Sequence, residues 1–279
     1  MNLENKIRLL LLQFLYPFKS YSMKLLRTNV LYIVITAFIT LQIPIAIAGN
    51  SPDAGTLLHN IHKPAAAEAA APVLSAEEMM LHTADSIYDT LQLLQAGLEI
   101  EAFELAYKGY YKLKELGRIN KTDVLTIADF SKPSSQKRLF VIDMELGKIL
   151  FQTLVAHGRN SGLIYANAFS NKPESNKSSL GFYRTLQSYY GEKGYAMRLE
   201  GLEKGINDKA FERAIVFHGS DYVTSSFLQS NGYLGRSLGC PAVPMQQTKP
   251  IINTIKNGSL LFIYHPTEQY KTKSAILNS

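Results

Sequence analysis

Residues 212–244 read ERAIVFHGSDYVTSSFLQSNGYLGRSLGCPAVP. The apolar run Ala214–Phe217 predicts a β-strand that ends at His218 and Gly219. A polar loop follows and leads to Cys240, which is the only cysteine in the 279 residues. The chain between the histidine and the cysteine is long enough for two elements to fold back on one another. We therefore predict that His218 and Cys240 meet in one site.

A thiol beside an imidazole is a reactive pair, because the imidazole takes the thiol proton and the thiolate is the nucleophile. Gly239 removes a side chain at the place where a substrate carbonyl has to approach Cys240. Pro241 has no N–H, so the predicted oxyanion hole uses the N–H groups of Gly239 and Cys240. From these residues alone, a buried and inert cysteine is an equal alternative. A redox-sensing thiol is disfavoured, since the chain has no second cysteine to resolve it.

Residues next to this pair are candidates for orienting it or for binding a substrate. Gly219 lets the chain turn and lets another group come close to His218. Ser237 is a candidate to steady the loop or to hydrogen-bond a substrate. Arg236 has a planar head that suits a carboxylate, although a solvated surface cation is the alternative. Tyr222 is expected either to line the cleft or to pack under the loop.

Short runs rich in β-branched and aromatic residues predict a mainly β catalytic region. No long helices alternate with these runs, which argues against a doubly wound parallel sheet. One late helix is predicted over 245–257, with Gly258 as its stop. His157 and Arg159, which follow one of the runs, are expected to be structural residues at a strand end. The predicted strands are 124–130, 138–144, 149–156, 181–185, 195–199, 212–218 and 259–264.

A helical hairpin is predicted over 75–120, before the β region. Ser75 and Glu78 have the spacing of a capping box. Behind them, apolar residues recur near helical spacing, Gly97 is a candidate C-cap, and Gly117 ends a second helix. The second helix carries a stripe that is expected to pack into the core, with a binding face as the alternative. This stripe consists of Phe103, Tyr107, Tyr110 and Leu113.

Residues 1–48 have the features of a secretory leader, which predicts an exported protein. Met23 is the expected start, residues 30–43 form an apolar run, and Ala-Ile-Ala at 46–48 is an A-x-A cleavage site. An uncleaved membrane anchor is the alternative, although the apolar run is short for a span. The small and polar residues over 49–74 predict a linker.

The net charge of +6 does not indicate nucleic-acid binding. Five cations and one anion lie in the leader, so the rest of the chain carries only a small positive charge and no basic stripe. His59 and His62 stand without carboxylate or cysteine companions, and no metal site is predicted. Residues 269–279 are expected to form a polar tail.

The motif in 212–244 resembles the signature of the murein L,D-transpeptidase catalytic domain family (YkuD-like). His218-Gly219 matches the histidine element of that family, and Ser237-x-Gly239-Cys240 matches its nucleophile element. Residues 178–183 lie where members usually have a Thr-Pro-x-Gly-x-Phe element. The resemblance covers roughly residues 122–265 and does not include the helical hairpin.

The chain departs from the family pattern around the cysteine. Leu238 stands where many members have a second histidine, and Pro241 and Ala242 follow the nucleophile. The chain therefore resembles a divergent branch. The resemblance implies a β-sandwich-like catalytic domain, which we expect over 121–268.

The resemblance also implies chemistry on peptidoglycan stem peptides. Cys240 would attack the carbonyl of the third residue and expel the terminal D-Ala, with His218 as general base. The amine of a second stem would resolve the thioester and form a 3–3 cross-link. Water as acceptor would give an L,D-carboxypeptidase, and a non-catalytic wall-binding protein of the same fold is the other alternative.

The resemblance implies no metal, no organic cofactor and no nucleic-acid partner. The expected location is the periplasm or the cell-wall space. Membrane contact is expected only through the leader, if it stays uncleaved.

Overall fold

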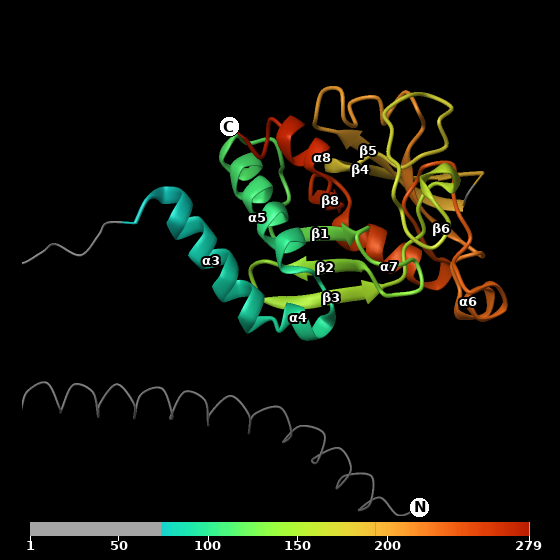
Figure 1. The fold of residues 1–279 in the computed structure, drawn as a ribbon, viewed down its shortest axis with the longest axis horizontal. Helices are drawn as coiled ribbons and strands as arrows, with labels where there is room; N and C mark the ends of the chain where they lie inside the picture. The colour runs from blue at the N-terminus through green and yellow to red at the C-terminus, as the bar shows by residue number, and fades with distance from the viewer. Residues whose placement is uncertain (1–73, 193, 279) are drawn as a thin grey trace, which may run out of the picture. The chain divides into compact units, whose positions relative to one another are not determined.

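Eight strands form one mixed sheet in the order β3-β2-β1-β8-β4-β5-β6-β7 (Figure 1). Neighbouring strands are antiparallel except β1 with β8 and β6 with β7, which are parallel. Just after β3, the N–H of Ala156 donates to the carbonyl of Ala242 in β7 at 2.8 Å, so the two edges of the sheet meet and the barrel nearly closes. The strands are β1 Val124–Asp129, β2 Leu139–Asp143, β3 Lys148–Thr153, β4 Gly181–Gly191, β5 Gly194–Gly201, β6 Val216–Ser220, β7 Ala242–Pro244 and β8 Leu260–Tyr264.

The computed structural model describes residues 74–192 and 194–278. The leader expected over 1–48 and nearly all of the linker expected over 49–74 lie outside these residues. Within the described ranges, no helix combines the length and apolar character needed to cross a membrane.

The mainly β fold is confirmed, and all the predicted strands belong to the single sheet. One strand is displaced: β6 begins at Val216, whereas a strand was predicted from residue 212. Residues 212–214 instead form a turn that passes through Ala214 with φ +51°, which lies outside the extended region of a strand. The short strand β7 and the helix α6 (Ser225–Asn231) were not predicted, because neither is long enough to show a period.

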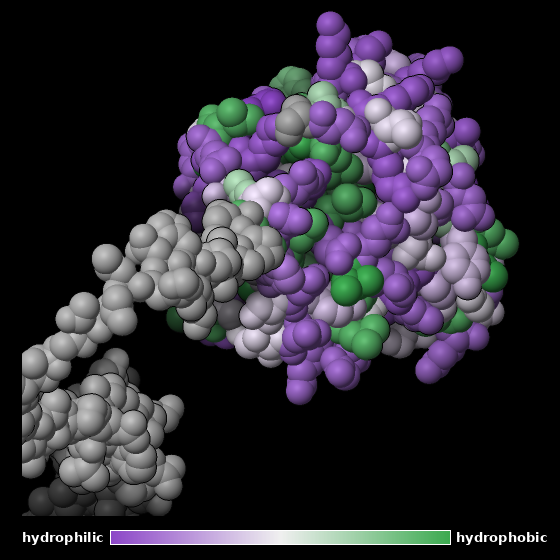
Figure 2. All heavy atoms as spheres, turned by 60° about the vertical axis from the view of Figure 1, so that its left-hand side comes forward, coloured by the Kyte–Doolittle hydropathy of each residue, from purple (hydrophilic) through white to green (hydrophobic). Residues whose placement is uncertain are grey.

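The helix α5 (Ile100–Glu115) packs on β1 and β8 at the centre of the sheet (Figure 1). Every residue of β1 and β8 is buried. The tyrosine-containing stripe of α5 is buried as well, so it belongs to the core. Figure 2, which turns the helical side of the molecule forward, shows a predominantly hydrophilic surface with scattered hydrophobic side chains.

Two shorter helices precede α5, namely α3 (Ala76–Thr90) and α4 (Leu93–Ala96). The predicted capping box is present: the N–H of Glu78 donates to the Ser75 hydroxyl, and the Glu78 carboxylate accepts from the N–H of Ser75 at 2.7 Å. The helical region is therefore a three-helix segment, with Gln92 and Gly97 in left-handed conformations at its two bends.

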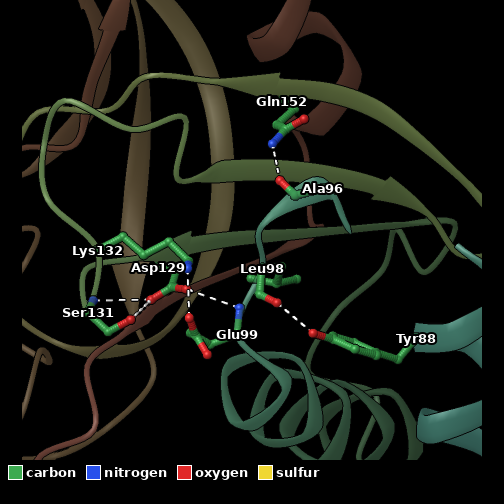
Figure 3. A network of polar contacts seen from close by, with 8 residues as sticks. All are labelled: Tyr88, Ala96, Leu98, Glu99, Asp129, Ser131, Lys132 and Gln152. Carbon is green, nitrogen blue, oxygen red and sulfur yellow. Dashed lines mark hydrogen bonds and ion pairs between the residues drawn. The ribbon is translucent and has the colours of Figure 1, made fainter. Parts of the chain in front are cut away.

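Polar contacts tie this helical segment to the end of β1 (Figure 3). The buried carboxylate of Asp129 accepts from the N–H of Glu99 at 3.3 Å, and Lys132 pairs with the Glu99 carboxylate at 2.7 Å. The Tyr88 hydroxyl donates to the carbonyl of Leu98 at 2.6 Å. The helices are thus attached to the barrel at the turn where α4 leads into α5.

The C-terminal residues, which were expected to form a polar tail, are instead part of the fold. The helix α8 (Glu268–Lys273) lies beside α5 (Figure 1), and Lys271 pairs with Glu101 of α5 at 2.9 Å. The buried carboxylate of Glu203 accepts from the hydroxyls of Tyr270, at 3.1 Å, and Ser274. The prediction was wrong because only isolated apolar residues in this segment are buried, too few to form a periodic pattern. They are Tyr270, Ile276 and Leu277.

We predict that Gly109→Ala lowers the free energy of unfolding, although alanine is normally favoured over glycine in a helix by about 1 kcal/mol. An added Cβ at Gly109 would lie 2.1 Å from the Phe182 ring, which stacks on Phe262. Overpacking of this kind costs about 1–3 kcal/mol, which urea denaturation would measure. Phe182→Leu should relieve part of that cost in the double variant. A Gly109→Ala protein more stable than wild type would contradict this packing.

Candidate active site

The pairing of β6 with β7 brings His218 and Cys240 to one place. His218 is opposite Ala242 in the parallel register, and its N–H donates to the carbonyl of Pro241 at 3.4 Å. The sulfur of Cys240 accepts from the N–H of Val216, two residues before His218, at 3.4 Å. The thiol of Cys240 thus contacts the strand that carries His218.

These two side chains line one cavity of about 510 Å³. His218 is 4% exposed, whereas Cys240 is half-buried, so the cysteine is the more accessible residue of the two. The wall is built by the β4–β5 hairpin, the turn before β6, and the loop around the cysteine. It consists of Tyr189, Glu192, Arg213, Ala214, Ile215, Val216, His218, Tyr222, Arg236, Ser237, Leu238 and Cys240.

A hydrogen bond to Gly219 decides the tautomer of His218. The Nδ1 atom lies 2.8 Å from the carbonyl oxygen of Gly219, which can only accept, so Nδ1 carries the hydrogen. In the neutral imidazole, Nε2 is then the unprotonated nitrogen. The ring is thereby prepared to accept a proton at Nε2.

Gly219 acts through its backbone and through the absence of a side chain. A Cβ at this position would lie 2.1 Å from the Thr248 hydroxyl on α7 (Met245–Ile255). Gly219 thus lets α7 approach one face of β6 while its carbonyl orients His218. These contacts fit the orienting one of its two candidate roles.

The cysteine loop is held by the side chains of two buried serines. The Ser237 hydroxyl donates to the carbonyl of Cys240 at 2.6 Å and accepts from the N–H of Gly239 at 3.1 Å. The Ser178 hydroxyl donates to the carbonyl of Gly239 at 3.1 Å. Ser237 therefore steadies the loop, which is one of its two expected roles. The N–H of Gly239 was predicted to contribute to the oxyanion hole. Because it already donates to the Ser237 hydroxyl, we do not assign it that role.

Tyr222 and Arg236 both line the cavity. Tyr222 also packs against Gly235, where a Cβ would lie 2.4 Å from that of the tyrosine. Burial, together with the negative charge that Cys240 can carry, raises the pKa of Tyr222. Arg236 donates to the carbonyls of Arg159 and Gly162 at 3.2 and 3.3 Å and makes no ion pair within the described part of the chain.

His157 is a structural residue, as expected, and belongs to a buried network behind the loop. Its Nδ1 accepts from the guanidinium of Arg138 at 2.8 Å, and its Nε2 donates to the carbonyl of Gly162 at 3.3 Å. Burial and the nearby charge of Arg138 lower the pKa of His157 to about 4. Arg138 is fully buried and also donates to the carbonyls of Lys132 and Val155.

Sequence reasoning did not single out several residues of the site, among them Arg213, Ser178 and Tyr189. Arg213 stands in a polar turn and Tyr189 near a hairpin tip, so no local spacing marks either of them. Ser178 belongs to the element matched to the family, but its hydrogen bond to Gly239 joins residues 61 positions apart. Among the described residues, no group of three or more His, Cys, Asp or Glu side chains could hold a metal ion.

We predict that Gly239→Ala destabilises the protein more than an alanine at another glycine of positive φ, because the added Cβ also crowds the cysteine loop. Gly239 has φ +128°, and a Cβ there would lie 2.8 Å from the carbonyl oxygen of Lys177. The expected loss is about 1–3 kcal/mol of unfolding free energy, measured by urea denaturation, with slower alkylation of Cys240. Gly232→Ala is the matched control, because Gly232 has φ +76° and open space around it. Equal effects of the two substitutions would argue against crowding at the loop.

His157 should make the protein less stable in acid. Its folded-state pKa lies below the ordinary value of 6.5, so its contribution is present above pH 6.5 and is lost as the pH falls toward about 4. The difference corresponds to roughly 3 kcal/mol of unfolding free energy. His157→Asn, which keeps an acceptor for Arg138 but does not titrate, should lack this part of the pH dependence in urea denaturation. His82→Asn, at an exposed position, should keep it.

Comparison with known proteins identifies the family of this site. The model of the L,D-transpeptidase catalytic domain matches residues 94–264, which is more than half of the chain. The match begins inside the helical segment, so it includes α5, which the resemblance seen in the sequence had excluded. A comparison with curated protein sequences finds no match.

Similar solved structures include an L,D-transpeptidase from Mycobacterium smegmatis, with 14% identity and a TM-score of 0.32. The match covers 51% of the present chain and 59% of the M. smegmatis protein. An L,D-transpeptidase from Mycobacterium tuberculosis H37Rv has 15% identity and a TM-score of 0.34, and the match covers 51% of this chain and 58% of that one. From the extent of the family match, the chain belongs to the L,D-transpeptidase catalytic domain family.

Proposed function

We propose that this protein is a peptidoglycan L,D-transpeptidase that forms 3–3 cross-links, with Cys240 as nucleophile and His218 as general base. One observation carries the proposal: His218, with its Nδ1 hydrogen bonded to the Gly219 carbonyl, lines the same cavity as the thiol of Cys240. This arrangement is suited to proton transfer from sulfur to Nε2. Membership of the family supports the substrate class.

The first half-reaction forms a thioester. The thiolate of Cys240 attacks the carbonyl carbon of the third stem residue, and the C–N bond to the terminal D-Ala breaks. His218, which took the thiol proton, gives it to the leaving amine. The acyl group then remains on the sulfur as a covalent intermediate.

In the second half-reaction, the side-chain amine of another stem attacks the thioester carbonyl. His218 accepts the proton of the attacking amine, the C–S bond breaks, and the thiolate returns. The product is a 3–3 cross-link between two stems. If water replaces the amine, the same steps release a tripeptide stem, which is the carboxypeptidase reaction.

Substrate contacts follow from the cavity wall. We assign Arg236 to a stem carboxylate, because its head is near the surface and only one of its terminal nitrogens is committed to backbone carbonyls. Tyr222 provides an apolar wall next to the thiol. No metal or organic cofactor takes part in the proposed steps. We also propose export to the periplasm or cell-wall space through the leader in residues 1–48.

The test is incubation of the purified protein with tetrapeptide-bearing muropeptides, followed by mass spectrometry of the intact protein and the products. Wild type should form an adduct with loss of D-Ala, and Cys240→Ala should form none. His218→Gln should lower the rate of adduct formation by about 10²–10⁴-fold, since general-base catalysis contributes that much.

The products distinguish the alternatives. A dimeric 3–3 product establishes the transpeptidase, whereas a tripeptide monomer alone establishes an L,D-carboxypeptidase. Folded wild-type protein that forms neither adduct nor product with several stem types would refute the enzyme proposal. Wall binding that persists in that protein and in Cys240→Ala would support a non-catalytic wall-binding protein.

A further inference from the structure

Arg213 is a charged side chain in the wall of the candidate active site that the sequence did not mark. It immediately precedes Ala214, whose carbonyl oxygen is 3.8 Å from the sulfur of Cys240. Its Nη2 atom lies 3.2 Å from the point where a Cβ on Gly239 would stand. The guanidinium is thus next to the backbone that carries the nucleophile.

The terminal nitrogens of Arg213 are fully committed to protein oxygens. Nη1 donates to the carbonyl of Ser170 at 2.7 Å and to the Ser179 hydroxyl. Nη2 donates to the carbonyl of Lys177 at 2.6 Å and to the Ser175 hydroxyl at 3.3 Å. Each terminal nitrogen of an arginine has two hydrogens, and all four are used by these contacts. No two N–H donors therefore remain to bind both oxygens of a carboxylate end-on. Arg213 therefore cannot clamp a substrate carboxylate in the bidentate manner.

All four of these partners are neutral, and Arg213 makes no ion pair with a carboxylate in the described residues. A half-buried cation without a counter-ion is unfavourable, and burial accordingly lowers the pKa of Arg213. An anion that forms in the cavity offsets this cost. The thiolate of Cys240 is such an anion. A negative charge on the buried Tyr183 or on Cys240 would act on the pKa of Arg213 in the opposite direction to burial.

We propose that Arg213 is a positioning residue whose charge stabilises the thiolate of Cys240 and whose hydrogen bonds hold residues 170–179 beneath the cysteine loop. This proposal deepens the proposed function, since it concerns the same nucleophile. A cation next to a cysteine favours the thiolate form. Other titratable or charged groups line the same cavity from the surrounding elements. They are Tyr189, Glu192, His218, Tyr222 and Arg236.

The experiment measures the alkylation rate of Cys240 by iodoacetamide between pH 5 and pH 10, with intact-protein mass spectrometry. Since Cys240 is the only cysteine, the rate reports this thiol alone. Its pH midpoint belongs to the coupled pair of Cys240 and His218, so all variants retain His218. Removing a nearby opposite charge in Arg213→Gln should raise the midpoint by about one pH unit. Well below the midpoint, alkylation should become about tenfold slower.

Two further variants separate charge from structure. Arg213→Lys keeps the charge but loses the fork of hydrogen bonds, so its midpoint should stay near that of wild type even if the protein is less stable. Arg184→Gln is the control, because Arg184 pairs with Glu200 at 2.6 Å and is not part of the cavity wall. Its midpoint should equal that of wild type.

A folded Arg213→Gln protein with an unchanged midpoint would overturn the proposal, because a purely structural residue would behave in that way. If Arg213→Gln does not fold, Arg213→Lys decides: a wild-type midpoint supports the role of charge, and a raised midpoint contradicts it. Alkylation requires no peptidoglycan. Failure of the muropeptide assay would therefore refute the proposed function and leave the role of Arg213 to be judged by its own result.

Discussion

The parallel pairing of β6 with β7 is the constraint on which the candidate site depends. It places the histidine strand beside the segment that leaves the cysteine, and it joins them by backbone hydrogen bonds. Backbone pairing is rigid compared with side-chain contacts, so the relative position of the two catalytic candidates is set by the sheet. The same β7 accepts the hydrogen bond from Ala156, which brings the two edges of the sheet together. The strand that nearly closes the barrel is thus also the strand that holds the cysteine beside the histidine.

The segment that follows β3 supports the cysteine loop from the other side. Ser237 donates its N–H to the carbonyl of His157, and Arg159 donates its N–H to the carbonyl of Ser237. Behind this segment, buried Arg138 contacts His157 and donates to the carbonyls of Lys132 and Val155. Leaving such groups unsatisfied in the interior costs about 1–3 kcal/mol each. The network therefore gives the nucleophile a stiff support without taking part in its chemistry.

The two arginines that line the cavity have different roles in the proposed reaction. Arg213 has its terminal nitrogens occupied by neutral oxygens of the protein, so it acts through its charge. Arg236 uses only one terminal nitrogen for protein carbonyls and has donors left to meet a substrate. In the proposed reaction, one cation serves the nucleophile and the other serves the stem peptide.

The sequence by itself determined the mainly β fold and the buried stripe of α5, and it predicted the pair of residues that line the candidate site. These features leave local marks, such as β-branched runs, helical spacing, and a motif around Cys240 and His218. Tertiary structure alone decided the closure of the barrel, the tautomer of His218, the commitment of the Gly239 N–H to Ser237, and the placing of Arg213. It also decided that α8 packs on the core through Glu203. Each of these depends on hydrogen bonds or packing whose geometry no local sequence pattern records, and most join residues far apart in the chain.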